Sequence, residues 1–150
     1  MRAVVTRVNS ASVAIDGTIR GEIGKGFLIL LGVAPEDTEL HVRKLAEKIL
    51  GLRVFRDEQD KMNLSLADVG GGVLVVSQFT LYADCSHGRR PNFMGAAAPE
   101  KANALYEKFL AECESLGFPP QHGEFGAYMQ VTSENDGPVT LIIDTQELKI

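Results

Sequence analysis

Cysteine is scarce in this 150-residue chain: only Cys85 and Cys113 are present, and neither belongs to a Cys-x-x-Cys pair. This pattern is typical of a reducing compartment and indicates no metal or redox site built on cysteine. Apolar runs are short as well. The most apolar one, Phe27 to Val33, falls far below the roughly 18 residues of a membrane-spanning helix and follows a charged segment, unlike a signal peptide. We therefore expect a cytoplasmic protein that does not bind membranes.

Positive charge is in the minority, with 15 Lys and Arg against 20 Asp and Glu and a net charge of −5. A protein that coats long stretches of nucleic acid needs a Lys or Arg for each phosphate it neutralises, so the composition disfavours that class. Recognition of one short nucleic-acid end is still compatible with it. The 45% hydrophobic and 23% charged content is typical of globular proteins, and the length fits one domain over residues 1–150.

Hydrophobic periodicity predicts two main helices and about eight strands. The first helix is expected to open at Pro35-Glu36-Asp37, and the second to run from near Pro99 to Gly117. The expected strands are 1–8, 11–16, 18–23, 26–33, 52–55, 73–81, 125–131 and 139–143. Such elements joined by short turns indicate a mixed α+β domain.

The sequence signatures of common catalytic sites are missing. There is no Gly-x-Gly-x-x-Gly, no phosphate-binding loop, no His-Glu-x-x-His and no Gly-x-Ser-x-Gly. The histidines, His41, His87 and His122, are scattered, and we expect them on the solvated surface. No pair of carboxylates stands out from the general acidity. A hydrolase built on a histidine base or on a metal is therefore poorly supported, and we expect no metal site.

Two segments place polar residues in unusual positions. Residues 77–81, Ser-Gln-Phe-Thr-Leu, continue an apolar strand, and they form either an edge strand emerging into solvent or a strand that lines a cleft with polar groups. In a regular strand Ser77 and Thr80 would face opposite sides. Residues 135–138, Asn-Asp-Gly-Pro, precede the last expected strand. They form either a turn that feeds this strand or a strained Gly–Pro peptide that aims carbonyl oxygens at a ligand.

Together, these two segments resemble the signature motifs of the D-aminoacyl-tRNA deacylases. Further similar stretches follow in register along almost the whole chain, up to about Thr145. They are Arg7-Val8, Ala11-Ser12-Val13, Gly21-Glu22-Ile23-Gly24, Lys61-Met62-Asn63-Leu64, Gly88-Arg89-Arg90-Pro91-Asn92-Phe93 and Phe125-Gly126-Ala127-Tyr128-Met129. Ser133 is a departure, because members of the family tend to carry an apolar residue there. We expect it to loosen the strand ahead of the Gly–Pro turn.

The resemblance implies an α+β fold of the deacylase type: a mixed, largely antiparallel sheet, curled like a barrel and packed by two main helices. It implies an enzyme, working without a cofactor, that hydrolyses the ester between a D-amino acid and the 3′-terminal adenosine of tRNA. It further implies a homodimer with each active site at the subunit interface. The partner is then the 3′ acceptor end of tRNA carrying a D-amino acid or glycine, and Lys25, Arg89 and Arg90 are candidate phosphate contacts.

The resemblance also implies which residues bind the substrate and select its chirality. Gly137 and Pro138, joined by a cis peptide bond, would reach into the pocket of the partner subunit and hold the substrate ammonium with their carbonyl oxygens. Arg7 would brace this Gly–Pro turn. Phe125 and Met129 would form the pocket wall. The site would reject L-amino acids through a clash with rigid backbone.

For catalysis, the resemblance assigns the reacting end of the substrate to the backbone N–H groups of Phe79 and Thr80, with Ser77 and Gln78 beside them. The 2′-hydroxyl of the RNA would assist the reaction, and an alternative makes Thr80 a nucleophile. Two other functions remain open. One is a general esterase or peptidase that uses Thr80 or Ser77, and the other is a module that binds an RNA end or a small molecule without catalysis.

Overall fold

Eight strands, three α-helices and two 3₁₀ helices make up the fold of the chain. The computed structural model describes residues 1–150, and none of its helices is long and apolar enough to cross a membrane. In chain order the elements are β1 (Arg2–Ile15), β2 (Thr18–Ile23), β3 (Gly26–Gly32), α1 (Glu39–Leu50), β4 (Phe55–Arg56), β5 (Met62–Leu64), α2 (Leu66–Val69), β6 (Gly72–Ser77), η1 (Phe79–Tyr82), α3 (Pro99–Ser115), β7 (Gln121–His122), β8 (Gln130–Asp144) and η2 (Thr145–Glu147).

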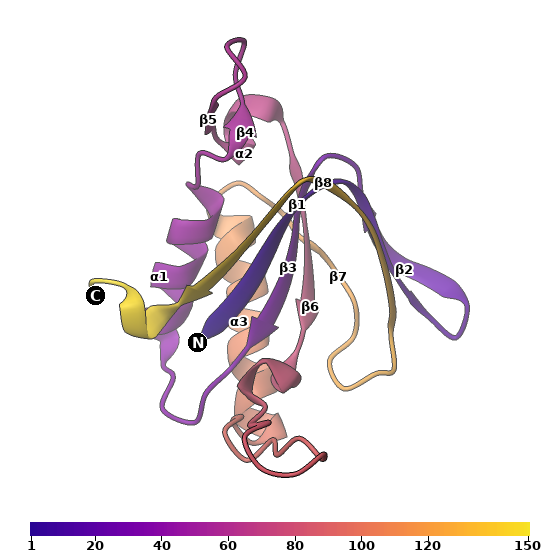
Figure 1. Cartoon of the computed structure of the whole chain (residues 1–150), viewed down its shortest axis with the longest axis vertical. Helices are drawn as coiled ribbons and strands as arrows, with labels where there is room; N and C mark the ends of the chain where they lie inside the picture. Colours follow the sequence, from indigo (N-terminus) through magenta and orange to yellow (C-terminus); the bar gives the residue numbers. More distant parts are fainter.

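Six of the strands form one mixed sheet, in which β1 pairs with three other strands (Figure 1). Antiparallel pairing joins β1 to β2, β3 and β8, whereas β3–β6 and β6–β7 are parallel. The sheet curls until Gly21 of β2 lies against the backbone of His122 in β7, where an added Cβ would be 2.9 Å from the His122 carbonyl oxygen. The predicted α+β fold, with a largely antiparallel and barrel-like sheet, is confirmed.

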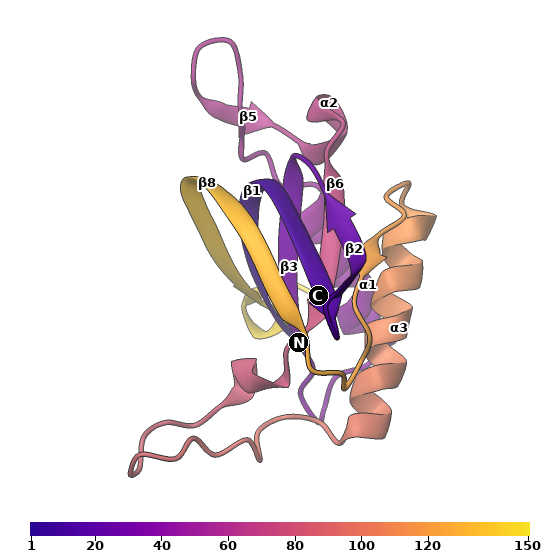
Figure 2. The same cartoon turned by 90° about the vertical axis from the view of Figure 1, so that its right-hand side faces the viewer.

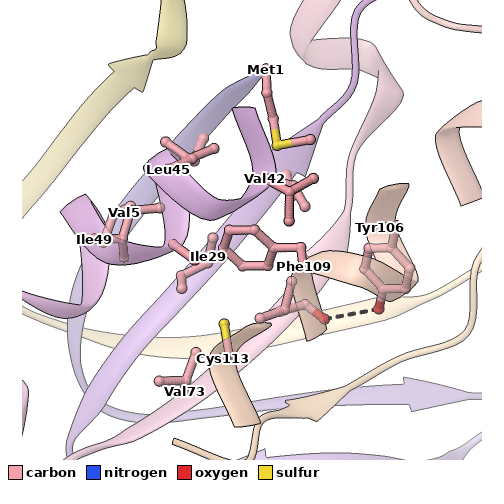
Figure 3. Close-up of a cluster of buried hydrophobic side chains, with 14 of the residues drawn as sticks. Met1, Val5, Ile29, Val42, Leu45, Ile49, Val73, Tyr106, Phe109 and Cys113 are labelled. Carbon is pink, nitrogen blue, oxygen red and sulfur yellow. Dashed lines mark hydrogen bonds between the residues drawn. The ribbon is translucent and has the colours of Figure 1, made fainter. Parts of the chain in front are cut away.

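Helices α1 and α3 cover one face of this sheet, and the main core lies between them and β1, β3 and β6 (Figures 2 and 3). Ile29, Leu45 and Phe109 are completely buried there. Burying a side chain of this kind stabilises the fold by roughly 1.5–3 kcal/mol. The Tyr106 hydroxyl in this core has a partner, because it donates to the Val75 carbonyl at 3.3 Å. The prediction of two main packing helices is confirmed.

A smaller apolar cluster lies on the opposite face of the sheet. Its buried members are Val8, Ala11, Val13, Leu28, Leu74 and Val76. Met129, from the loop before β8, packs against this cluster. The sheet is therefore apolar on both faces around β6, and this explains why the sequence of β6 is a continuous apolar run rather than an alternating one.

The first helix begins later than the sequence predicts. Pro35 and Asp37 lie in a turn, and α1 begins at Glu39 with Thr38 as its N-cap. Asp37 does not serve the helix dipole. Its carboxylate accepts from the buried Met1 ammonium at 2.7 Å and from the Ala34 N–H at 2.6 Å. A tertiary ion pair, which no local pattern reveals, thus fixes this residue.

Several strand boundaries also need correction. The strand expected over 73–81 ends at Ser77, the one expected over 52–55 is the two-residue β4, and 125–129 is loop. The expected turn at 135–138 does not end the strand, because β8 continues through these residues and pairs with β1 before and after them. Ser133 does not end this pairing either and lies opposite Ala11. The sequence did not predict β8 as one long strand, because its hydrophobic pattern changes at the irregular segment in its middle.

Candidate active site

A largely apolar cavity of about 620 Å³ lies at the end of β6, next to η1. It is enclosed by the end of β6 with η1, by the segment that leads into α3, and by the loop before β8. The lining residues are Val76, Ser77, Gln78, Phe79, Phe93, Ala96, Ala97, Ala98, Pro99, Ala102, Phe125, Gly126, Ala127, Tyr128, Met129 and Val131. Its volume is in the range of small-molecule sites, and its wall offers aromatic surface to a flat ligand.

Free backbone donors lie at the edge of this cavity, where β6 gives way to η1. The helical bonding of η1 starts with the Leu81 N–H, which donates to the Gln78 carbonyl at 3.2 Å. The N–H groups of Phe79 and Thr80 precede this bond and have no partner within the helix, and Gln78 provides no side-chain cap. Two adjacent free donors of this kind can stabilise a developing negative charge on an oxygen atom.

Two residues that the sequence analysis did not single out hold η1 in place. Arg2 donates to the Leu81 carbonyl at 2.7 Å and lies 4.7 Å above the centre of the Tyr82 ring. Gly32 lies beneath η1, where an added Cβ would be 3.2 Å from the Gln78 carbonyl oxygen. Arg2 is 79 positions from Leu81, so no sequence pattern could have found this contact. Gly32 gave a weak signal, as the glycine that ends an apolar strand.

Titratable groups are almost absent from the cavity wall, which contains no Asp, Glu, His, Lys, Arg or Cys. The Thr80 hydroxyl accepts a hydrogen bond from the Gln78 side-chain amide. An amide is not a base, and it cannot take the hydroxyl proton that a nucleophilic Thr80 would have to lose. The arrangement therefore favours chemistry carried by backbone donors over chemistry carried by an activated Thr80 or Ser77.

The second motif forms a bulge in β8. Thr6 pairs with Thr140 and Val8 with Asn135, so residues 136–139 project from the ladder. Gly137 has φ of +119°, a conformation that favours glycine, and the Gly137–Pro138 bond is cis as predicted.

The side chain of Arg7, which is only 4% exposed, binds the main chain of this bulge. Its guanidinium donates to the Val54 carbonyl at 2.6 Å and to the Asp136 carbonyl at 3.3 Å. It also forms an ion pair of 3.2 Å with the Asp136 carboxylate. Arg56 of β4 makes a second ion pair with Asp136, at 3.7 Å. The main chain at Gly137 is thereby held rigidly against β1.

The structure does not bring the two motifs together within one chain. Through the register, Ser77 is level with Ala3 of β1, four residues from Arg7, and three strand spacings separate β6 from β8. Measured along the sheet, these offsets separate the bulge from Ser77 by about 20 Å. Gly137 and Pro138 line a separate depression of about 430 Å³ that shares no residue with the cavity.

The predicted site residues thus fall into two groups. Ser77, Gln78, Phe79, Phe125 and Met129 all line the cavity, and Thr80 adjoins it. Arg7, Gly137 and Pro138 lie together at the bulge. No cluster of His, Cys, Asp and Glu that could hold a metal ion is present.

Comparisons with known proteins place the chain in a family. The model of the D-Tyr-tRNA(Tyr) deacylase family matches residues 4–144. Proteins named D-aminoacyl-tRNA deacylase from Desulfatibacillum aliphaticivorans and Thermus aquaticus are 58% and 57% identical to the chain. The first match covers 97% of this chain and 100% of the relative, and the second covers 98% and 97%.

Two solved structures share the fold. A c-Myc DNA unwinding element binding protein superposes with a TM-score of 0.90 at 42% identity, covering 96% of this chain and 98% of that one. A probable eukaryotic D-amino acid tRNA deacylase has a TM-score of 0.79 at 17% identity, covering 95% and 97% of the two chains. The second likeness concerns the fold alone.

Proposed function

The chain belongs to the D-aminoacyl-tRNA deacylase family and is a hydrolase of aminoacyl-tRNA esters, and we propose that a second copy of the chain completes its active site. One observation carries this proposal: the free donors of Phe79 and Thr80 and the bulge at Gly137–Pro138 are too far apart in one chain to hold one amino acid. In a homodimer, the bulge of each subunit would enter the cavity of the other.

The exposed edge of β8 supports a homodimer. Only β1 pairs with this 15-residue strand, so its other edge is free. Val131 and Ile142 on β8 are 41% and 71% exposed. Long uncovered edges invite pairing with another chain, and the bulge at Gly137–Pro138 lies on this same strand.

In the completed site, the cavity would take the terminal adenosine of tRNA between aromatic walls such as Phe79 and Phe125. The carbonyl oxygens of Gly137 and Pro138 from the other subunit would accept hydrogen bonds from the substrate ammonium. In this placement, the aromatic wall of the cavity contacts the adenine base, and the carbonyl oxygens of the bulge contact the positive charge of the ammonium. A substrate that is used in the cytoplasm also supports the expectation that the enzyme acts there.

The reaction then follows from the donors at η1. Water adds to the ester carbonyl carbon, and the N–H groups of Phe79 and Thr80 stabilise the negative charge on the carbonyl oxygen. The bond to the ribose oxygen breaks, this oxygen takes a proton, and the free amino acid and the tRNA leave. Because the cavity wall contains no base, the neighbouring 2′-hydroxyl of the RNA would orient the water and relay its proton.

Chirality would be read by exclusion. With the ammonium and the carbonyl held, one direction at the α-carbon points towards the Gly137 carbonyl and the other points outward. An L side chain would occupy the first direction and clash with main chain that Arg7 holds in place. A D side chain would point outward, and glycine has nothing to exclude. The site would therefore accept glycine and D-amino acids of many kinds while rejecting the abundant L-amino acids.

Complementation between two inactive variants tests the shared site. Ala98→Trp would fill the cavity mouth of one chain, and Gly137→Ala would displace the bulge of the other. Refolded together at equal amounts, half of the dimers are mixed, and each mixed dimer has one site with two intact halves. We expect about a quarter of the wild-type rate to return on D-Tyr-tRNA. A rate no higher than that of either variant alone would place the whole site within one chain.

A further inference from the structure

We propose that the exposed loop from Asp84 to Phe93, here named the arginine loop, binds phosphates of the tRNA 3′ end through Arg89 and Arg90. The proposal rests on the proposed function, because it assumes that the terminal adenosine occupies the cavity. It concerns the nucleotides that precede this adenosine, which the cavity cannot contain.

The arginine loop is built onto the rim of the cavity. Asp84 and Asn92 close its base with two main-chain hydrogen bonds of 2.7 and 2.9 Å. Phe93 then packs edge-on against Phe79, with 5.2 Å between ring centres, and both rings line the cavity. Between η1 and α3 this part of the chain reaches away from the sheet (Figure 2). A strand of RNA leaving the cavity on this side would pass along the loop.

The charges on the loop are available to a ligand. Arg89 and Arg90 are exposed, and neither forms an ion pair, in contrast to Arg2, Arg7 and Arg56. The nearby Asp84 carboxylate is engaged at the loop base, where it accepts from the Ser86 N–H at 2.9 Å. Two adjacent unpaired guanidinium groups concentrate positive charge on this loop, in a chain with a net charge of −5. Their planar donors suit phosphate oxygens, which attract them at any base sequence.

The distances agree with this assignment. Arg90 lies three positions before Phe93, so their Cα atoms are at most about 11 Å apart. Successive nucleotides of a stacked strand rise by about 3.4 Å, and the loop therefore lies within reach of the first three or so nucleotides beyond the adenosine. These nucleotides carry the phosphates nearest to the ester, so contacts there would orient the reacting end.

The test compares a full substrate with a truncated one. The substrates are D-Tyr-tRNA and D-tyrosyl-adenosine, which lacks every phosphate but keeps the ester. For Arg89→Gln/Arg90→Gln we expect kcat/KM on D-Tyr-tRNA to fall roughly tenfold, mainly through KM, as for two exposed charge contacts. The rate on D-tyrosyl-adenosine should not change. The slope of log kcat/KM against log salt concentration should become shallower by about 1.4, that is, by about 0.7 for each lost phosphate contact.

Two control variants make the comparison specific. Lys48→Gln/Lys149→Gln changes the net charge equally at the surface by α1 and the C-terminal segment, and it should leave both rates unchanged. Arg89→Lys/Arg90→Lys keeps the charge and should retain most of the activity on D-Tyr-tRNA.

Equal losses on both substrates would show that the loop only shapes the cavity, and equal losses in the Lys48/Lys149 variant would show an effect of net charge. Either result overturns the proposal, as does an unchanged rate on D-Tyr-tRNA. Failure of the proposed function is a separate observation, because it would appear as an inability of the wild-type enzyme to hydrolyse either substrate.

Discussion

Replacing Thr80 by alanine separates two mechanisms that use the same segment of η1. If Thr80 is a nucleophile, the substitution removes the reacting atom. If its backbone N–H stabilises the carbonyl oxygen, the substitution leaves the catalytic group in place. The side chain of Thr80 is half-buried and accepts one hydrogen bond, from the Gln78 amide, so alanine removes little else.

The expected magnitudes differ widely. Loss of one hydrogen bond costs about 0.5–1.5 kcal/mol, which lowers the rate between about 2- and 13-fold if the bond is needed in the transition state. Deletion of a nucleophile costs roughly 10⁴-fold or more. We therefore expect Thr80→Ala to keep about 8% or more of the wild-type rate. Thr80→Ser, which keeps the hydroxyl, serves as the matched control and should fall closer to the wild type.

A main-chain substitution completes the test. Replacing the Phe79–Thr80 peptide bond by an ester, through incorporation of the α-hydroxy acid analogue of threonine, removes the N–H of residue 80, keeps every side chain and weakens the Phe79 carbonyl as an acceptor. We expect this variant to lose about 10²–10³-fold in rate, as for a missing oxyanion donor. Single-turnover hydrolysis of D-Tyr-tRNA gives the rates, and circular dichroism confirms that each variant is folded. A loss of 10⁴-fold in Thr80→Ala with an intact fold would refute the argument and restore Thr80 as the nucleophile.

Three further outcomes can be measured. D-Ala, D-Tyr and D-Asp esters of tRNA should be hydrolysed at broadly similar rates, glycyl-tRNA measurably, and L-Ala-tRNA not detectably; comparable rates for L-Ala and D-Ala would show that the Gly–Pro bulge is not a chiral filter. Asp37→Asn leaves the buried Met1 ammonium without its ion pair and should lower the free energy of unfolding in urea by about 3–5 kcal/mol, and a loss below 1 kcal/mol would contradict this. Burial raises the pKa of the Cys113 thiol to about 12, so at pH 8 almost none of it is thiolate. Iodoacetamide should therefore modify only the exposed Cys85. Equal labelling of both thiols in the folded protein would contradict the burial of Cys113.

Regular periodicity in the sequence predicted the regular parts of the fold. The second main helix, expected from near Pro99 to Gly117, is found as α3 over Pro99–Ser115. The continuous apolar run of 26–33 is the buried strand β3. Helix α3 packs one face against the core, and β3 is buried on both faces. The hydrophobic pattern of each element follows from this packing and can be recognised in the local sequence.

Irregular segments could not be predicted in this way. The end of β6 at Ser77 and the start of η1 depend on Arg2 and Gly32, which hold η1 from elsewhere in the chain. The continuation of β8 through Gly137 depends on pairing with β1 on both sides of the bulge. Local patterns record none of these contacts, since the partners are distant in sequence.

The sequence by itself determined the family, through motifs in register along the chain, and it identified both groups of candidate site residues, at Phe79–Thr80 and at Gly137–Pro138. Their separation became visible only in the tertiary structure, because strand register and sheet order, which no motif encodes, set the distance between them. The structure also decided that the cavity wall contains no general base. A base can come from anywhere in the chain, and only the folded arrangement of the side chains shows whether one reaches the site.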